Sequence, residues 1–479
     1  MSDVYRPSKA HMALGSDFFD EVIPAVFPQT TLRFRNQAWA ERVGLGDMSE
    51  QDWIAHFAKF ESLAGSLEHP LALRYHGHQF GAYNPDLGDG RGFLFGQLFD
   101  PRDDRLLDLG TKGSGTTPWS RGGDGRLTLK GGIREILASE LLEAFGVNTS
   151  KSFSLVETGE ALERGDEPSP TRSSVLVRLS HSHIRIGTFQ RLAFLEDTEN
   201  LQKLTDYAIA HYYRHLDDQG SDERVAGFLG AVVDAVAQTG AQMIAAGFVH
   251  GVLNTDNINI TGECFDYGPW RFLPHYDPLF TAAYFDTAGR YAFGRQPDAL
   301  AWSLTRLAEC LVPISTVELL EPQLNRFWPH FQTALGQAVL NRLGLLPRDP
   351  EADHSFVSAF FAFMGAVKPA YEQVFFDLFG GLDNNTRMSA SPQAGLYRSD
   401  DFADLGNALS HYERNPQAAL HDPYFTSEAP CTMLIEQVEA LWSPIAERDD
   451  WSLFESTLKQ IRAMARANAH LHKSDAKSP

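Results

Sequence analysis

Short motifs in a fixed order between residues 88 and 268 constrain the fold of this chain more than any other feature. They are the Gly-rich loop GDGRG at 88–92, a lysine at the end of an expected strand, a glutamate in an amphipathic helix, the loop HGVLNTDN at 250–257 and the triplet DYG at 266–268. Each has an ordinary explanation alone, such as a hairpin turn for the glycines or a complement to the helix dipole for the glutamate. Their joint occurrence in this order is improbable by chance, so we interpret them together.

The order of the motifs matches that of the phosphate-binding and catalytic parts of protein kinases. Lys112 and Glu135 take the places of the kinase strand lysine and its helical glutamate, and Asp266 opens DYG where kinases have Asp-Phe-Gly. In the kinase loop the second residue after the histidine is an Asp that accepts the substrate proton, whereas here it is Val252. The chain is therefore either an inactive kinase relative or an enzyme with a different reaction.

The expected fold class is α+β, a protein-kinase-like two-lobed fold with a small β-rich N-lobe and a larger helical C-lobe. The segments GFLFGQLFD, RLLDLGTKG, KSFSLVET and SVLVRLS predict strands, and GGIREILASELLEAFG predicts a helix closed by Gly146. After residue 200 the apolar spacing becomes helical. We expect an N-terminal extension packed on the lobes at 1–75, an N-lobe at 76–190, a helical C-lobe with catalytic and metal-binding loops at 191–385, and a C-terminal helical region at 386–479.

The residue types in these motifs suit the binding of a nucleotide with a metal ion. A lysine is a compact charge for phosphate oxygens, and a lysine in a cleft needs a partner, which we expect to be Glu135 for Lys112. Asn257 and Asp266 are hard oxygen ligands of the kind that Mg²⁺ takes. Glycines in GDGRG let backbone N–H groups come close to phosphate oxygens.

Two further segments carry candidate nucleotide contacts. TTPWSRGGDGR, at 116–126, combines glycines with Arg121, Asp124 and Arg126, which suggests an ordered loop able to touch a nucleotide, although a flexible surface hairpin fits the pattern as well. RLSHSHIRIG supplies Arg178 and Arg185. In a protein with a net charge of −21, these arginines are candidates for a phosphate clamp.

Together these segments resemble the selenoprotein O family, also called SelO or YdiU, whose members are pseudokinases that act as protein AMPylators. The resemblance rests on YHGHQFGAYNPDLGDGRG, LGTKGSGTTPWSRGGDGR, IREILASE, SHIRIGTF and HGVLNTDN followed by DYGP, in order between residues 70 and 300. It implies a kinase-like fold that lacks the kinase base and binds ATP reversed in the cleft. The α-phosphorus, rather than the γ-phosphorus, would then face the protein substrate.

The resemblance also implies roles for particular residues. Mapped by motif, nucleotide contacts fall on Gly88, Gly90, Arg91, Lys112, Asp124, Gly125, Arg178, Arg185 and Asp266. Metal contacts fall on Asn257 and Asp266, the supporting ion pair on Glu135, and the catalytic proton acceptor is Asp256. Asp256 adjoins Asn257, which brings a carboxylate into the loop of the reacting phosphate. The extra arginines suit a reversed triphosphate, because its distal phosphates would lie where a kinase keeps an apolar adenine slot.

Composition disfavours several other functions. The net charge argues against a surface that binds nucleic acid or an anionic membrane, because both need clustered Lys and Arg.

The sequence also predicts a cytoplasmic location. No apolar run approaches the roughly 18 residues of a membrane span, and the segment MSDVYRPSKA lacks a secretory or transit pattern. Cys264, Cys310 and Cys431 are too scattered for a disulfide framework or a metal pair. The family often carries a C-terminal Cys-containing pair, and Cys431 has no such partner.

Three functions fit the sequence. The first is a protein adenylyltransferase that uses ATP with Mg²⁺ or Mn²⁺, modifies Ser, Thr or Tyr hydroxyls of proteins and releases pyrophosphate, with UMP transfer left open. The second is an ATP-sensing pseudokinase without turnover, which Val252 favours but the retained lysine, glutamate and metal ligands disfavour. The third is a kinase-like phosphotransferase in which Asp256 activates a hydroxyl toward the γ-phosphate.

Overall fold

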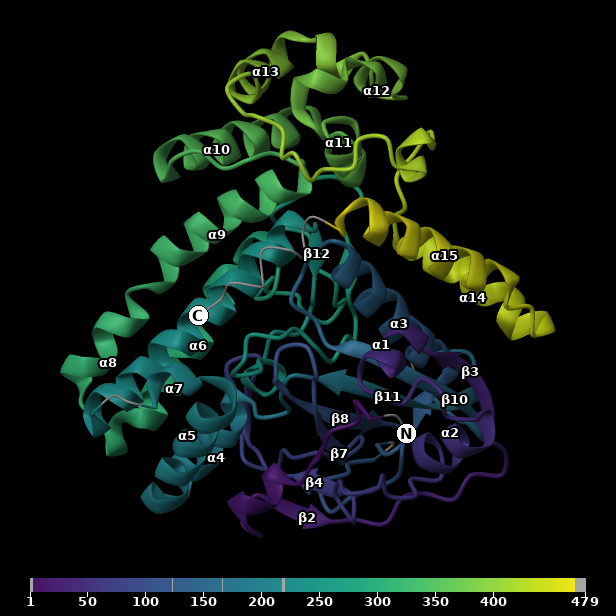
Figure 1. Ribbon diagram of the computed structural model, residues 1–479, viewed down its shortest axis with the longest axis vertical. Helices are drawn as coiled ribbons and strands as arrows, with labels where there is room; N and C mark the ends of the chain where they lie inside the picture. The colour runs from purple at the N-terminus through teal and green to yellow at the C-terminus, as the bar shows by residue number, and fades with distance from the viewer. Residues whose placement is uncertain (1–2, 123, 166, 218–219, 470–479) are drawn as a thin grey trace.

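The computed structural model describes residues 3–122, 124–165, 167–217 and 220–469, which fold into a β-sheet region and a larger helical region (Figure 1). The strands are β1 (Pro7–Ser8), β2 (Phe19–Glu21), β3 (Thr31–Arg35), β4 (Leu71–Leu73), β5 (Gly77–Gln79), β6 (Ala82–Asn84), β7 (Leu94–Phe99), β8 (Leu106–Lys112), β9 (Leu127–Thr128), β10 (Lys151–Leu162), β11 (Thr171–Ser180), β12 (Phe248–Val249) and β13 (Arg271–Phe272). The α-helices are α1 (Gln37–Arg42), α2 (Glu50–Phe57), α3 (Leu129–Ala144), α4 (Ile186–Phe194), α5 (Thr198–Tyr212), α6 (Ser221–Ala245), α7 (Gln296–Leu311), α8 (Val317–Leu324), α9 (Phe327–Arg342), α10 (Pro350–Val367), α11 (Tyr371–Asp377), α12 (Asn385–Ala390), α13 (Ala403–Leu409), α14 (Ile435–Arg448) and α15 (Ser452–Ala467).

The main sheet is antiparallel and has the strand order β2-β4-β7-β8-β11-β10-β3, with β1 beside β7 and β9 beside β11. Every residue of the central strand β8 is buried, as expected for a strand covered on both faces. In the register of β8 with β11, Lys112 pairs with Leu176 and Gly110 pairs with Arg178. Because side chains alternate along a strand, Lys112 and Arg178 leave the sheet on the same face.

Helix α3 covers that face. Gly146 follows its end with a positive φ of 77°, as predicted from the sequence. The Thr128 side chain, for which no role was predicted from the sequence, accepts a hydrogen bond from the Gly131 N–H at the start of the helix. Apolar residues of α3 pack in one core with Leu155 and Leu176 of the sheet. On the opposite face, α2 packs Trp53 against Phe153.

Segments from both ends of the described chain pack on this sheet. The first 75 residues supply β1 to β4, and α1 and α2 besides. Helices α14 and α15 lie beside α3 (Figure 1), where Lys130 pairs with Glu439, and Arg172 of β11 pairs with Asp449 after α14. The sheet region therefore contains more of the chain than the segment 76–190.

The long helix α6 delivers the chain to the loop at 250–257 and packs against α7, α8 and α9. Its part Glu223–Ala245 is long and apolar enough to cross a membrane by length and composition, so the expectation that no such segment exists is wrong on that criterion. The sequence of this helix shows no uninterrupted apolar run, because small and polar residues stand between its apolar ones. Of its most apolar stretch, 72% is buried against the rest of the structure, as in the core helix of a globular fold.

Candidate functional site

Lys112, Glu135 and Asp266 form the centre of the candidate site. The Lys112 Nζ atom lies 2.5 Å from Glu135 Oε1 and 2.7 Å from Asp266 Oδ1. The three residues come from the end of β8, from α3 and from the loop before β13. Only 10% of the Lys112 side chain and 3% of the Glu135 side chain are exposed. The contact predicted between the lysine and the glutamate is present, and the lysine also binds the Asp of DYG.

Asp266 is held as an anion by two cations. Arg178 Nη1 lies 3.3 Å from the same Oδ1 atom that Lys112 contacts. Burial disfavours the charged carboxylate, but Lys112 and Arg178 outweigh burial and hold the pKa of Asp266 well below its usual range. Its backbone has a positive φ of 62°, which a residue other than glycine rarely adopts. Strain of this kind is typical of functional sites.

Two hydrogen bonds fix the loop that carries Asp266. The His250 Nε2–H donates to the Phe265 carbonyl at 2.9 Å, and the Tyr267 N–H donates to Glu135 Oε2 at 3.3 Å. Burial lowers the pKa of His250, so the ring is neutral and can present the proton that a carbonyl acceptor requires. The histidine of HGVLNTDN therefore braces the DYG loop.

The residues Thr255–Asn257 form a single 3₁₀ turn that holds the proposed base and one of the two residues expected to bind a metal. The Asn257 Nδ2–H donates to the Val252 carbonyl at 3.0 Å, which leaves the amide oxygen free of this bond and able to accept a cation. Asp256 is 8% exposed, and within the described residues its Oδ1 has no hydrogen-bond partner. Burial raises the pKa of Asp256 to about 6 against the opposing charge of Arg185. Such a carboxylate is ionised at neutral pH and suited to accept a proton.

Arg178 and Arg185 are both nearly buried and share the ring of Phe265. Their guanidinium carbons lie 5.5 Å and 5.1 Å from its centroid. Arg185 also lies 3.1 Å from Asp89 Oδ1 and donates to the Asp256 carbonyl at 3.4 Å. Within the described residues neither Nε–H has a hydrogen-bond partner. Two buried guanidinium groups with spare donors suit a polyanionic ligand.

The Gly-rich loop packs closely against the loop 116–126. A Cβ atom on Gly88 would lie 2.4 Å from Trp119 Cγ, and one on Gly90 would lie 2.6 Å from the Trp119 carbonyl oxygen. Arg91 Nε donates to Asp124 Oδ1 at 3.2 Å, while 63% of the Arg91 side chain stays exposed. The glycines at 88 and 90 are therefore needed for the close approach of the second loop.

In the loop 116–126, of which residue 123 lies outside the described residues, several contacts converge on Asp124. Asp124 Oδ2 accepts from the Arg121 N–H at 3.0 Å, and Gly125 has a positive φ of 83°. Arg126 instead turns to β10, where its Nε lies 2.7 Å from Glu160. These contacts place the described part of this segment beside the Gly-rich loop.

Sequence reasoning missed three residues that assemble the site: Asp89, Trp119 and Phe265. Asp89 stands inside GDGRG, and an acid between glycines was the signal for a partner of an arginine. Trp119 is the one aromatic residue in the segment 116–126. Phe265 directly precedes DYG, but nothing local indicates that it lies between two arginines.

The donor set fits a divalent cation that arrives with a nucleotide. Across the described ranges no group of three or more His, Cys, Asp or Glu residues could hold a metal ion alone. Asn257 and Asp266 offer an amide oxygen and a carboxylate, both of which Mg²⁺ and Mn²⁺ accept. Two protein ligands suffice where phosphate oxygens and water complete the coordination.

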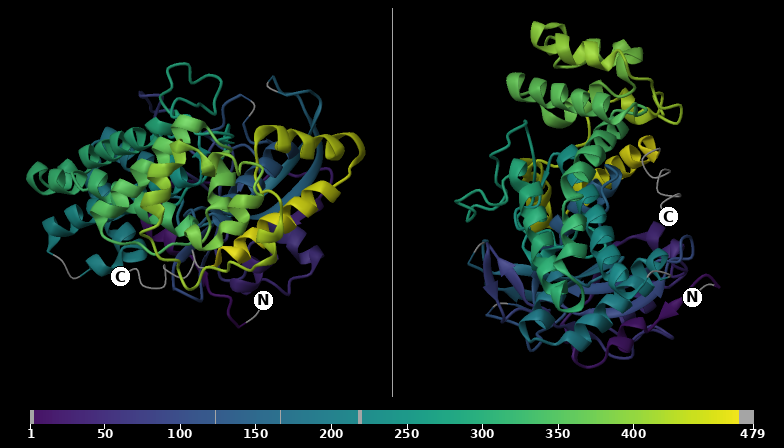
Figure 2. Two further views of the ribbon diagram at one scale, coloured as in Figure 1. Left: turned by 90° about the horizontal axis from the view of Figure 1, so that it is seen from above. Right: turned by 90° about the vertical axis from the view of Figure 1, so that its left-hand side faces the viewer.

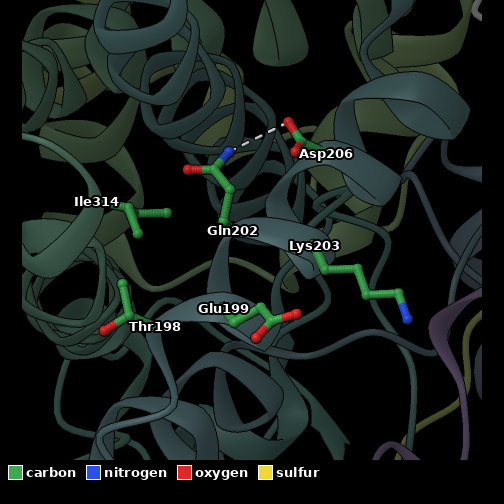
Figure 3. A pocket seen from close by; sticks show the side chains of 6 residues that line it. All are labelled: Thr198, Glu199, Gln202, Lys203, Asp206 and Ile314. Atoms are coloured by element: carbon green, nitrogen blue, oxygen red, sulfur yellow. Dashed lines mark hydrogen bonds between the residues drawn. The ribbon is translucent and has the colours of Figure 1, made fainter.

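A separate hollow lies on α5, away from these residues. It is lined by Thr198, Glu199, Gln202, Lys203, Asp206 and Ile314, and Gln202 Nε2 donates to Asp206 Oδ1 at 3.2 Å (Figure 3). None of the predicted site residues lines it. We therefore assign it no part in the site.

Comparison with known proteins places the chain in a family. The family model described as "Protein adenylyltransferase SelO" matches residues 4–462. Proteins named "Protein nucleotidyltransferase YdiU" are similar over nearly the whole length. The one from Trichormus variabilis is 42% identical over 475 residues, covering 96% of each chain. The one from Gloeobacter violaceus is 43% identical over 473 residues, covering 96% of this chain and 95% of its own.

The relative from Synechocystis sp. is 42% identical over 477 residues and is covered over 98% of its length. Matches of this extent include the Gly-rich loop, Lys112, the 250–257 loop and DYG together, so they confirm the resemblance drawn from those motifs. The chain belongs to the SelO family of protein adenylyltransferases.

Proposed function

We propose that this chain transfers AMP from ATP to Ser, Thr or Tyr hydroxyls of proteins, with Mg²⁺ or Mn²⁺ bound together with the nucleotide. Family membership supports a nucleotidyltransferase that uses ATP, and the relatives' names specify proteins as acceptors. The observation that carries the proposal is the second cationic group, Arg178 and Arg185, buried around Phe265 in addition to Lys112. A triphosphate with its distal end toward these arginines leaves the α-phosphate for the acceptor.

We also propose that the β-sheet and helical regions are the two lobes of a kinase-like fold, in which 76–190 and 191–385 are the kinase-like parts and the other segments are additions to them. The chain order of strand lysine, helical glutamate, catalytic loop and DYG supports this assignment. The contacts of Lys112 with Glu135 and Asp266 support it further, because they join strand, helix and loop in the kinase manner.

In the proposed reaction, the hydroxyl oxygen of the acceptor forms a bond to the α-phosphorus. The bond from that phosphorus to the oxygen that bridges to the β-phosphate breaks, and pyrophosphate leaves. Asp256 takes the hydroxyl proton, as its buried and ionised carboxylate allows. Lys112, Arg178 and Arg185 bind the negative oxygens and hold them in place. A divalent ion at Asn257 and Asp266 would offset phosphate charge when bound.

Transfer of isotope from ATP labelled at either the α- or the γ-phosphorus tests this function. The purified protein is incubated with Mn²⁺ or Mg²⁺ and a mixture of protein acceptors. Adenylyl transfer labels protein from α-labelled ATP only. Labelling from γ-labelled ATP would establish a phosphotransferase, and ATP binding without any labelling would establish a sensor. A parallel reaction with α-labelled UTP measures the preference for AMP over UMP.

A further inference from the structure

The β5–β6 hairpin has an unusual tip that lies next to the proposed catalytic loop. Gln79 pairs with Ala82, so Phe80 and Gly81 form a two-residue turn, and both have positive φ, 51° and 87°. Turns of this kind favour Asn or Gly at the first position, because a bulky side chain is strained there. Phe80 is nonetheless 39% exposed. An exposed aromatic residue in a strained turn indicates a function for the ring.

The hairpin is fixed to the loop 250–257 at several points. The Phe80 N–H donates to Asn254 Oδ1 at 3.0 Å, and the His78 N–H donates to Thr255 Oγ1 at 2.7 Å. Gly77 is so close that a Cβ atom there would lie 3.0 Å from Asp256 Oδ1. The exposed ring therefore stands on the element that covers the proposed base.

A second exposed apolar segment meets the hairpin tip. The loop between β13 and the helix α7 projects from the body of the molecule, in teal at the left of the right-hand view in Figure 2. In this loop Tyr284 is 89% exposed and Phe285 is 48% exposed. The Phe285 ring centroid lies 5.7 Å from that of Phe80 and 5.2 Å from that of Tyr284. The three rings form one continuous exposed strip, which we call the aromatic edge.

We propose that the aromatic edge, Phe80, Tyr284 and Phe285, is the docking surface for the acceptor protein, and that it binds an apolar side chain close in sequence to the modified hydroxyl. This inference rests on the proposed transfer to proteins. The occupant is an extended polypeptide segment, because Asp256 is only 8% exposed and a hydroxyl on a flat protein surface could not reach it. An apolar side chain suits the edge, since burying it against three aromatic rings removes apolar surface of both partners from water.

Two peptides and one turn-preserving variant test the proposal. Both peptides carry the same single Ser, Thr and Tyr. One has Leu and Phe around them and the other has Gln and Gly instead. Phe80→Asn removes the ring but retains the turn, because Asn tolerates positive φ. Val317→Ser, which removes an apolar side chain of similar exposure (54%) at the start of α8, is the matched control. Melting curves verify that all variants fold.

The wild type should use the apolar peptide with a KM about 10-fold lower than that for the polar peptide. Phe80→Asn should remove this difference by raising the KM of the apolar peptide alone, with ATP affinity unchanged, and Val317→Ser should behave as the wild type. Equal use of both peptides by the wild type, or an unchanged preference in Phe80→Asn, would overturn the docking surface.

Fluorescence anisotropy of the labelled peptides separates this inference from the proposed function. If no acceptor is labelled from ATP, the adenylyl transfer proposal fails. Binding of the apolar peptide to the ATP-loaded protein, weakened in Phe80→Asn and not in Val317→Ser, would still support the aromatic edge. Equal binding of both peptides would contradict it.

Discussion

Buried charge at single residues dominates the chemistry of this site. Lys112 is enclosed by two carboxylates, one of them nearly without solvent exposure. Removing one partner of a buried ion pair leaves an uncompensated charge, which costs far more than the loss of an exposed pair. Substitutions in this cluster therefore affect folding stability and activity together, and the two effects need separate measurements.

Lys112→Met should abolish transfer and lower the free energy of unfolding by about 3 kcal/mol, because Glu135 is left buried without its cation. Denaturant unfolding measures the stability and α-label transfer measures the activity. The double variant Lys112→Met with Glu135→Gln should recover most of the stability and none of the activity. A single variant as stable as the wild type would show that the pair does not have the enclosed geometry described here.

Asp256→Asn should lower turnover by roughly 100-fold to 10,000-fold while ATP and metal affinity stay nearly unchanged, because only the proton acceptor is lost. Asn257→Ala, at the neighbouring position, should instead weaken metal binding. Titrations with Mn²⁺ and ATP distinguish these effects. If the melting temperature of Asp256→Asn fell in proportion to its rate, the carboxylate would be a structural brace of the loop.

At the scale of elements, the Gly-rich loop at 88–92 and the loop 116–126 pack closely because glycine, without a side chain, stands where they meet. The Gly-rich loop and the loop 116–126 pack at distances that exclude a side chain at Gly88. The order of one loop therefore depends on the other, and both contribute residues for which the family resemblance implies nucleotide contacts.

Gly88→Ala should weaken ATP binding at least 10-fold with little loss of overall stability, because the added Cβ meets the Trp119 ring at 2.4 Å and displaces an exposed loop rather than the core. Gly122→Ala is the matched control, since no atom of the described residues lies within 4 Å of a Cβ there, apart from its chain neighbours. Isothermal titration calorimetry with ATP measures the affinity of each of the two variants. Equal affinities in the two variants would mean that the packing of these loops is irrelevant to the nucleotide.

Local elements of this fold could be predicted from the sequence, and long-range contacts could not. The expected strands KSFSLVET and SVLVRLS lie within β10 and β11, although both strands extend further toward the turn than predicted, and α3 follows the apolar periodicity. Lys112 and Glu135 follow the order of the motifs. The pair of Arg185 with Asp89, 96 residues apart, depends on how the two segments meet in space, which no local pattern encodes. The entry of residues 7–73 into the sheet escaped prediction for the same reason.

At the scale of the whole molecule, the N-terminal segment is anchored by a buried histidine. His11 is 3% exposed, and within the described residues neither ring nitrogen has a hydrogen-bond partner. Its backbone N–H donates to Gln97 Oε1 in the sheet at 2.7 Å, and its ring packs near Tyr207 of α5. The segment thus joins the sheet to the helices.

This histidine should make stability depend on pH. Burial lowers the pKa of His11 from 6.5 to about 4, so between these values the unfolded chain binds a proton that the folded chain does not. Stability from this group is therefore lost as the pH falls from 6.5 toward 4, by about 3 kcal/mol in all. The free energy of unfolding of the wild type and of His11→Gln is measured across this pH range. As the pH falls, the wild type should lose more of this free energy than the variant does. If the difference in free energy of unfolding between the two proteins were the same at every pH, this would contradict the burial of a neutral His11 ring.

Adenylyl transfer requires that the α-phosphate of ATP faces Asp256. The direct measurement is a structure of the full chain with a non-hydrolysable ATP analogue and Mn²⁺. We predict that the α-phosphorus is the phosphorus nearest to the Asp256 carboxylate, with the distal phosphates toward Arg178 and Arg185 and the metal on Asn257 and Asp266. A γ-phosphorus nearest to Asp256, with the adenine on the arginine side, would contradict adenylyl transfer and indicate a kinase-like reaction.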